Sequence, residues 1–216
     1  MNLDRRYDWS ATGPARLNRR AIPDIAVTDH EGRAARFYSD LTQGRLVLIA
    51  FTSVLHDAHY PCTAKLAAVR AALDQGPAAM AEIYTLTLDP DRDTPRRWAD
   101  HARRAGAGRG WRFLHARADD VERLRGALFV SRGAGPESGA RSLWRRADVL
   151  RMRPERAVMD CSLGLLRYGD EARDIWGGAP VRASAAAIAE RLEWLAGACV
   201  ARAGRRRAGP FPPGIA

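Results

Sequence analysis

The longest uninterrupted apolar run of the chain is RLVLIAFT, from Arg45 to Thr52, and Gly44 and polar residues bound it. A run without alternation is typical of a strand that is covered on both faces. Upstream, a short extended segment opens at Ile22-Pro23-Asp24, and GRAARFYSDL (32–41) indicates a turn and a second edge element. The pattern therefore predicts a packed domain that starts near residue 21 and has its central strand at 45–52.

Helical spacing follows this strand. Pro61 suits the first turn of a helix. Apolar residues then recur every three or four positions until Gly76, at Cys62, Leu66, Val69 and Leu73. The next segment, EIYTLTL (82–88), alternates like a second strand. Strand, helix and strand in this order imply a right-handed parallel crossover.

The second half of the chain adds a helix, a strand and a helix, and then a ββα unit. A helix is predicted to begin at Asp93-Thr94-Pro95, where a capping side chain precedes proline. The later predicted elements are a strand at 111–115, a helix around 121–128, a hairpin of 157–161 and 165–168 that turns near 162–164, and a last helix that carries Ile188, Leu192, Leu195 and Cys199. This order is that of an α/β thioredoxin-like fold.

The composition favours one domain. The 216 residues are 46% hydrophobic and 28% charged, which is enough for one good core and too little for two. We expect residues 1–20 to form a flexible basic arm, 21–200 the domain, and 201–216 a disordered tail rich in Pro, Gly and Arg.

The chain is strongly basic, with 35 basic against 25 acidic residues and a formal net charge of +10. Nearly all of these cations are arginines, scattered through every segment without interleaved aromatic residues, so we expect no nucleic-acid partner. The first twenty residues contain no apolar stretch of the length that a signal peptide or membrane anchor requires. We therefore expect a cytoplasmic protein without a membrane span, or a periplasmic one if the sequence lacks part of its natural start.

The segment 81–130 carries a specific marker, DPDRDTP (89–95), at the end of a strand and the start of a helix. Together with the Phe-x-x-Asp-Leu turn of FYSDL before the central strand, it resembles the SCO/SenC family, with similarity over roughly residues 22–195. The resemblance implies a thioredoxin-like fold with SCO-type insertions. It also implies a role in copper delivery or cytochrome oxidase assembly.

The family resemblance further implies a CxxxCP motif after the central strand and a histidine before the hairpin, which together bind copper. Anchored on Pro61, the two cysteine positions fall on His56 and Tyr60, and the histidine position falls near Arg153. Anchored on Phe51-Thr52, the cysteine positions fall on Val54 and Ala58 instead. Phenol and guanidinium groups are poor ligands for cuprous ion. We therefore interpret the chain as a degenerate relative that has lost the three ligands.

Other residues of the same loop could still bind metal. His56, His59 and Cys62 follow one another at HxxHxxC spacing, and two imidazoles and a thiolate would suit copper or zinc. The alternative is that both histidines are solvated loop residues. Asp89, Asp91 and Asp93 lack the Gly and Glu of a calcium loop and are interpreted as turn and cap residues.

Cys62 is also a candidate reactive thiol, because a cysteine in the first turn of a helix has a lowered pKa. It lies, however, on the apolar stripe of its helix, so burial as a small hydrophobic residue is the alternative. Cys161 and Cys199 are expected in the core, and neither is placed to resolve a disulfide with Cys62.

Three classes of function follow. The first is a non-catalytic binding or assembly factor with a protein partner, related to copper delivery or oxidase assembly. The second is a copper carrier that uses His56, His59 and Cys62. The third is a single-cysteine thiol oxidoreductase or peroxidase, which requires Cys62 to be exposed beside a cation. The absence of a CxxxC dithiol motif argues against an enzyme.

Overall fold

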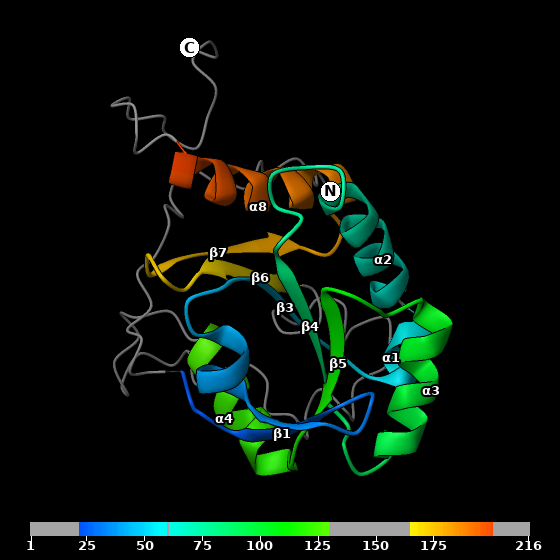
Figure 1. Cartoon of the computed structure of the whole chain (residues 1–216). Coiled ribbons are helices and arrows are strands. Elements are labelled where there is room, and N and C mark those ends of the chain that lie inside the picture. Colours follow the sequence, from blue (N-terminus) through cyan, green and yellow to red (C-terminus); the bar gives the residue numbers. More distant parts are fainter. Residues whose placement is uncertain (1–21, 60, 130–164, 201–216) are drawn as a thin grey trace, which may run out of the picture.

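The structure is a computed structural model that describes residues 22–59, 61–129 and 165–200 (Figure 1). Its described residues form one seven-stranded sheet in the order β2-β1-β5-β4-β3-β6-β7. The strands are β1 (Ala26–Asp29), β2 (Ala34–Arg36), β3 (Leu46–Thr52), β4 (Glu82–Thr87), β5 (Trp111–His115), β6 (Leu165–Asp170) and β7 (Ile175–Pro180). The helical elements are η3 (Phe37–Thr42), α1 (Val54–His59), α2 (Cys62–Leu73), α3 (Pro95–Ala105), α4 (Ala118–Phe129) and α8 (Ala185–Val200).

Strand β3 lies inside the sheet between β4 and β6, and all seven of its residues are buried. It pairs in parallel with β4, and β4 pairs in parallel with β5, as the predicted crossover requires. On its other side β3 pairs antiparallel with β6, in a register that puts Ile49 opposite Arg167. The carboxyl ends of β3, β4 and β5 therefore meet at one edge of the sheet, where ligands bind in open α/β folds.

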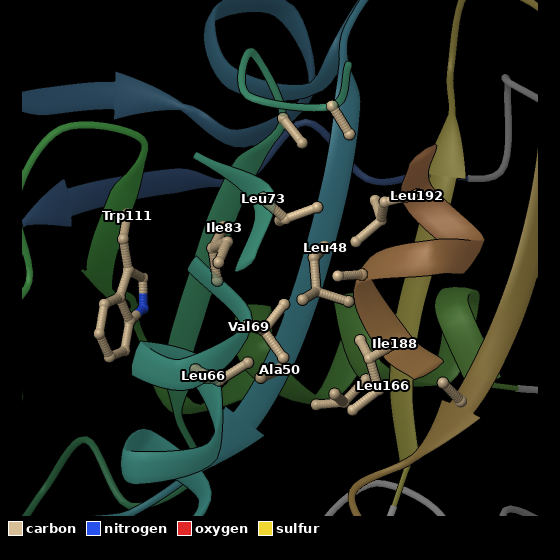
Figure 2. Close-up of a cluster of buried hydrophobic side chains, with 14 of the residues drawn as sticks. Leu48, Ala50, Leu66, Val69, Leu73, Ile83, Trp111, Leu166, Ile188 and Leu192 are labelled. Atoms are coloured by element: carbon tan, nitrogen blue, oxygen red, sulfur yellow. The ribbon is translucent and has the colours of Figure 1, made fainter. Parts of the chain in front are cut away.

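Each face of the sheet buries its own apolar cluster. One cluster joins β3 and β4 to the apolar stripes of α2, α3 and α8. Figure 2 shows Leu66 and Val69 of α2 and Ile188 of α8 gathered around Leu48 of β3. The opposite cluster contains Phe37 and other residues of η3, the apolar stripe of α4, and Trp176 of β7. Alternation along β3 supplies both clusters, because successive side chains point to opposite faces.

Two tryptophans fix α3 and β5 to this frame. The indole N–H of Trp98 in α3 donates to the backbone carbonyl of Leu114 at 3.2 Å, and that of Trp111 donates to Thr85 Oγ1 at 2.9 Å. Thr94 caps α3 by accepting from Arg97 N, and Pro95 opens the helix, as predicted. The docking of α3 decides the position of His101, which stacks on Trp98.

The predicted hairpin is wrong in its position along the chain. The observed hairpin joins β6 to β7 through a turn at residues 171–174, which begins nine positions later than the predicted turn at 162–164. Asp174 takes a left-handed φ of 54° in this turn, and Asp tolerates that conformation better than most residues. The predicted strand 157–161 lies outside the described residues, as do the arm 1–20 and the tail 201–216.

Two helical elements are absent from the sequence-based prediction. Residues 37–42, predicted as an edge element, form η3, and α1 occupies the loop where no helix was predicted. Both are single short turns without a full apolar period, so the sequence pattern does not distinguish them from loops. Among the described residues, none of the helices is both long and apolar enough to cross a membrane.

Candidate functional site

The candidate site is the segment from Ser53 to Thr63, at the carboxyl edge of the parallel strands. It is tied to β4 by Asp93, whose Oδ2 accepts hydrogen bonds from Val54 N at 3.1 Å and from Thr87 Oγ1 at 2.7 Å. Burial raises the pKa of Asp93, and these two hydrogen bonds only partly oppose that effect. Asp93 thus holds the end of β4 against the start of α1.

His56, the first of the three predicted metal ligands, is buried with an exposed fraction of 3%. Its Nδ1 lies 2.6 Å from Ser53 Oγ, and the same hydroxyl accepts from His56 N at 3.2 Å. The interpretation of His56 as a solvated loop residue is therefore wrong. The ring is instead part of a buried hydrogen-bonded turn at the start of α1.

Asp57, the next residue, joins three helices. Its Oδ1 accepts from Thr63 N at 2.8 Å, its Oδ2 accepts from the Thr63 hydroxyl, and His101 Nε2 lies 3.1 Å from the same Oδ2. The His101 contact is short but is not aligned as a hydrogen bond. Asp57 thereby caps the first turn of α2 and connects it to α3.

Burial alone would raise the pKa of Asp57, but the His101 ring and the two Thr63 donors more than compensate and hold that pKa below its usual value. Asp57 is therefore an anion at neutral pH. This carboxylate faces the first turn of α2, where the next residue to consider, Cys62, is located.

Cys62 has an exposed fraction of 4% and belongs to the apolar cluster shared by α2, α3 and α8. Burial, together with the Asp57 carboxylate, raises the pKa of its thiol to about 12. These two effects exceed the lowering that a helix N-terminus produces. Cys62 is thus not exposed, and the charged group that acts on it among the described residues is an anion, so the alternative of a buried small hydrophobic residue is the one observed.

The donor set of the described residues does not fit copper. Among residues 22–59, 61–129 and 165–200, no three His, Cys, Asp or Glu side chains form a group that could hold a metal ion. His56 Nδ1 is engaged by Ser53, and the Cys62 thiol is packed in the core. The side chain of His59, together with Tyr60 and Arg153, lies outside the described residues, so the site of His56, His59 and Cys62 stays a prediction.

The acidic residues of DPDRDTP are turn residues. Asp89 N donates to Thr87 Oγ1 at 3.0 Å, and the Asp89 carbonyl accepts from Asp93 N at 2.7 Å. The turn interpretation is confirmed for Asp89 and for the backbone of Asp93, whereas the side chain that caps α3 is that of Thr94. The sequence analysis missed the cluster of Asp57, Thr63 and His101, because its members come from three helices; the one local signal was an acidic residue six positions before a predicted first helical turn.

Comparison with known proteins supports the fold. No known family profile matches the sequence, and no curated protein matches it. Among solved structures, the chain is similar to the SCO protein BsSco, described as a member of the Sco family of cytochrome c oxidase assembly proteins. That match has a TM-score of 0.59 at 14% identity, over 86% of this chain and 96% of the other.

Two further matches agree. A SCO1/SenC family lipoprotein from Bacillus anthracis matches with a TM-score of 0.58 at 13% identity, over 85% of this chain and 97% of that one. Yeast Sco1 with copper bound matches with a TM-score of 0.56 at 14% identity, over 85% and 94% of the two chains. The chain therefore has the thioredoxin-like fold of SCO proteins, as predicted. At sequence identities this low, the matches show the fold alone.

Proposed function

We propose that this protein is a non-catalytic binding or assembly factor built on a SCO-like thioredoxin fold, related to copper delivery or oxidase assembly. One observation carries the proposal. The segment at which the family resemblance implies copper chemistry is held by internal hydrogen bonds in this chain, between Ser53 and His56 and from Thr63 to Asp57.

The buried thiol supports the same proposal. Thiol-disulfide exchange and peroxide reduction both proceed through an accessible thiolate. Cys62 is buried, and its pKa of about 12 leaves it almost wholly protonated at neutral pH. A protein partner, rather than a redox substrate, is the ligand class that remains for this edge of the sheet.

A cuprous-ion competition assay tests the absence of a metal site. The full chain is titrated against a chromophoric cuprous chelator, alongside His59→Ala and Cys62→Ser. We expect the chelator to keep the copper in all three samples. Stoichiometric capture by the wild type that His59→Ala or Cys62→Ser abolishes would replace this proposal with the copper carrier that uses His56, His59 and Cys62.

The assembly role is tested in cells. The cytochrome oxidase activity of membranes is measured after deletion of the gene, and after complementation with the wild type or with Cys62→Ser. Loss of oxidase activity on deletion, with equal rescue by both forms, is the expected result. Oxidase activity that is unchanged by deletion contradicts the assembly role, and rescue by the wild type alone would give the Cys62 thiol a function.

A further inference from the structure

Arg167 of β6 is a partly buried arginine whose Nε atom is fully buried. Figure 2 shows the preceding residue, Leu166, pointing into the cluster of α2 and α8. Tyr168 packs against the same cluster. Because side chains alternate along a strand, Arg167 points to the opposite face of the sheet, where Ile49, its partner on β3, is buried with η3 and α4.

The unpaired donor of Arg167 is its Nε. Its Nε is fully buried, and no residue in the described part of the chain accepts a hydrogen bond from it. None of those residues forms an ion pair with this guanidinium either, and burial lowers the pKa of Arg167 from its ordinary value. An arginine cannot shed its proton to escape burial, so a buried Nε without an acceptor is costly, and an anion or an ordered acceptor beside it would remove that cost.

Trp176 of β7 brings a second unpaired donor to the same face. Its side chain is 1% exposed, and its indole N–H is buried without an acceptor among the described residues. Trp176 pairs with Gly169, two residues along β6 from Arg167, and its ring lies over that glycine. Arg167 and Trp176 are diagonal neighbours on adjacent strands, at a spacing that long and aromatic side chains can bridge.

Glycine stands at the other positions around this pair. Gly178 is the cross-strand partner of Arg167, so β7 brings no side chain to the guanidinium at that point. A Cβ at Gly169 would lie 2.4 Å from Cε3 of Trp176, so the ring occupies the space over that residue. The hairpin thus places two unpaired N–H donors next to backbone that carries no competing side chain.

We propose that Arg167 and Trp176 bind an oxyanion, a carboxylate or phosphate group, on the sheet face covered by η3 and α4. Guanidinium groups match the planar oxygens of these anions, and a buried indole N–H supplies a neutral donor to the same oxygens. The anion has two sources, a free ion or a carboxylate of a protein segment. The experiment separates them.

The test depends on whether removal of the guanidinium raises or lowers the melting temperature. Replacing an unpaired buried cation by an apolar residue of similar length is neutral or stabilising, whereas removing one partner of a buried pair is destabilising. Melting temperatures of the full chain are measured for the wild type, Arg167→Met, Arg167→Lys and Trp176→Phe, with Arg104→Met as the control at an exposed arginine of α3. Each is measured with sodium phosphate or with sodium chloride at equal ionic strength.

If a free oxyanion binds, phosphate raises the melting temperature of the wild type by about 5 °C or more at a hundredfold excess over its Kd. Arg167→Met loses this rise, and Trp176→Phe loses part of it. Phosphate also stabilises proteins nonspecifically, and the rise that remains in Arg167→Met measures that contribution. Arg104→Met keeps the site, so it should respond to phosphate as the wild type does. If a protein carboxylate binds, Arg167→Met melts several degrees lower in both salts, and the effects of Arg167→Met and Trp176→Phe are not additive.

One combination of melting temperatures would overturn the proposal. Arg167→Met then melts at or above the wild-type temperature in both salts, with a phosphate response equal to that of Arg104→Met. Arg167→Lys guards against a simple packing effect, because it keeps the charge and most of the stem but removes the Nε donor. A melting temperature of Arg167→Lys between those of the wild type and Arg167→Met supports anion binding.

Discussion

Removing the Asp57 carboxylate is expected to destabilise the fold more than removing any exposed acidic residue. Asp57→Ala deprives Thr63 N of its acceptor, which as a helix cap contributes about 1 kcal/mol. It also removes a hydrogen bond between the Thr63 hydroxyl and a charged acceptor, a type that contributes about 1.5–3 kcal/mol. We expect a loss of about 2–4 kcal/mol in the free energy of unfolding at pH 7, with the melting temperature lower by about 5–10 °C.

The assay is urea unfolding followed by circular dichroism, with Asp100→Ala as the matched control. Asp100 pairs with Arg103, whose side chain is 76% exposed, and such pairs contribute less than about 1 kcal/mol. Asp57→Asn should fall between the wild type and Asp57→Ala, because its amide oxygen still accepts from Thr63 N. Thr63→Val completes a double-mutant cycle, in which coupling with Asp57→Ala is expected.

The pH dependence gives an independent check. The pKa of Asp57 is lower in the folded state than in the unfolded chain, so its charge stabilises the fold at every pH above the unfolded value of about 4. That contribution disappears as the pH falls through the folded pKa. The gap between wild type and Asp57→Asn should therefore shrink below about pH 4. A gap that stays constant down to pH 3, or an Asp57→Ala variant within about 0.5 kcal/mol of the wild type at pH 7, would refute the reasoning.

Three further predictions concern the core. Cys62 should resist iodoacetamide at pH 8 in the native protein and react in denaturant, as peptide mass spectrometry at this residue will show; fast native labelling would contradict its burial. Arg70→Met should lower the free energy of unfolding in urea by about 2–4 kcal/mol, because this buried guanidinium donates to two backbone carbonyls before β4 at 2.6 and 3.0 Å. The exposed control Arg103→Met should lower it by less than about 0.5 kcal/mol. Gly169→Ala should cost about 1–3 kcal/mol by pushing on the Trp176 ring, and a neutral result would show that this ring can move aside.

The candidate site shows where prediction from sequence stops. The residue types of HDAHYPC allowed a metal site, a reactive thiol or a buried thiol, and local pattern could not choose among them. The choice for Cys62 depends on how closely α2 packs against α3 and α8, since that packing sets both its exposure and its pKa. His101 is 44 residues from Asp57 in the chain, and only the docking of α3 through Trp98 brings the two together.

The sequence by itself determined the elements with a full hydrophobic period: the buried run that became β3, the stripes of α2 and α8, and the Thr94-Pro95 start of α3. Such elements follow from local rules, because side-chain alternation and helix capping depend on neighbours within a few residues. The tertiary structure decided the hairpin register, the helices η3 and α1, the burial of His56 and Cys62, and the unpaired donors of Arg167 and Trp176. Each of these depends on contacts between segments far apart in the chain, and the residue pattern of one segment does not indicate such contacts.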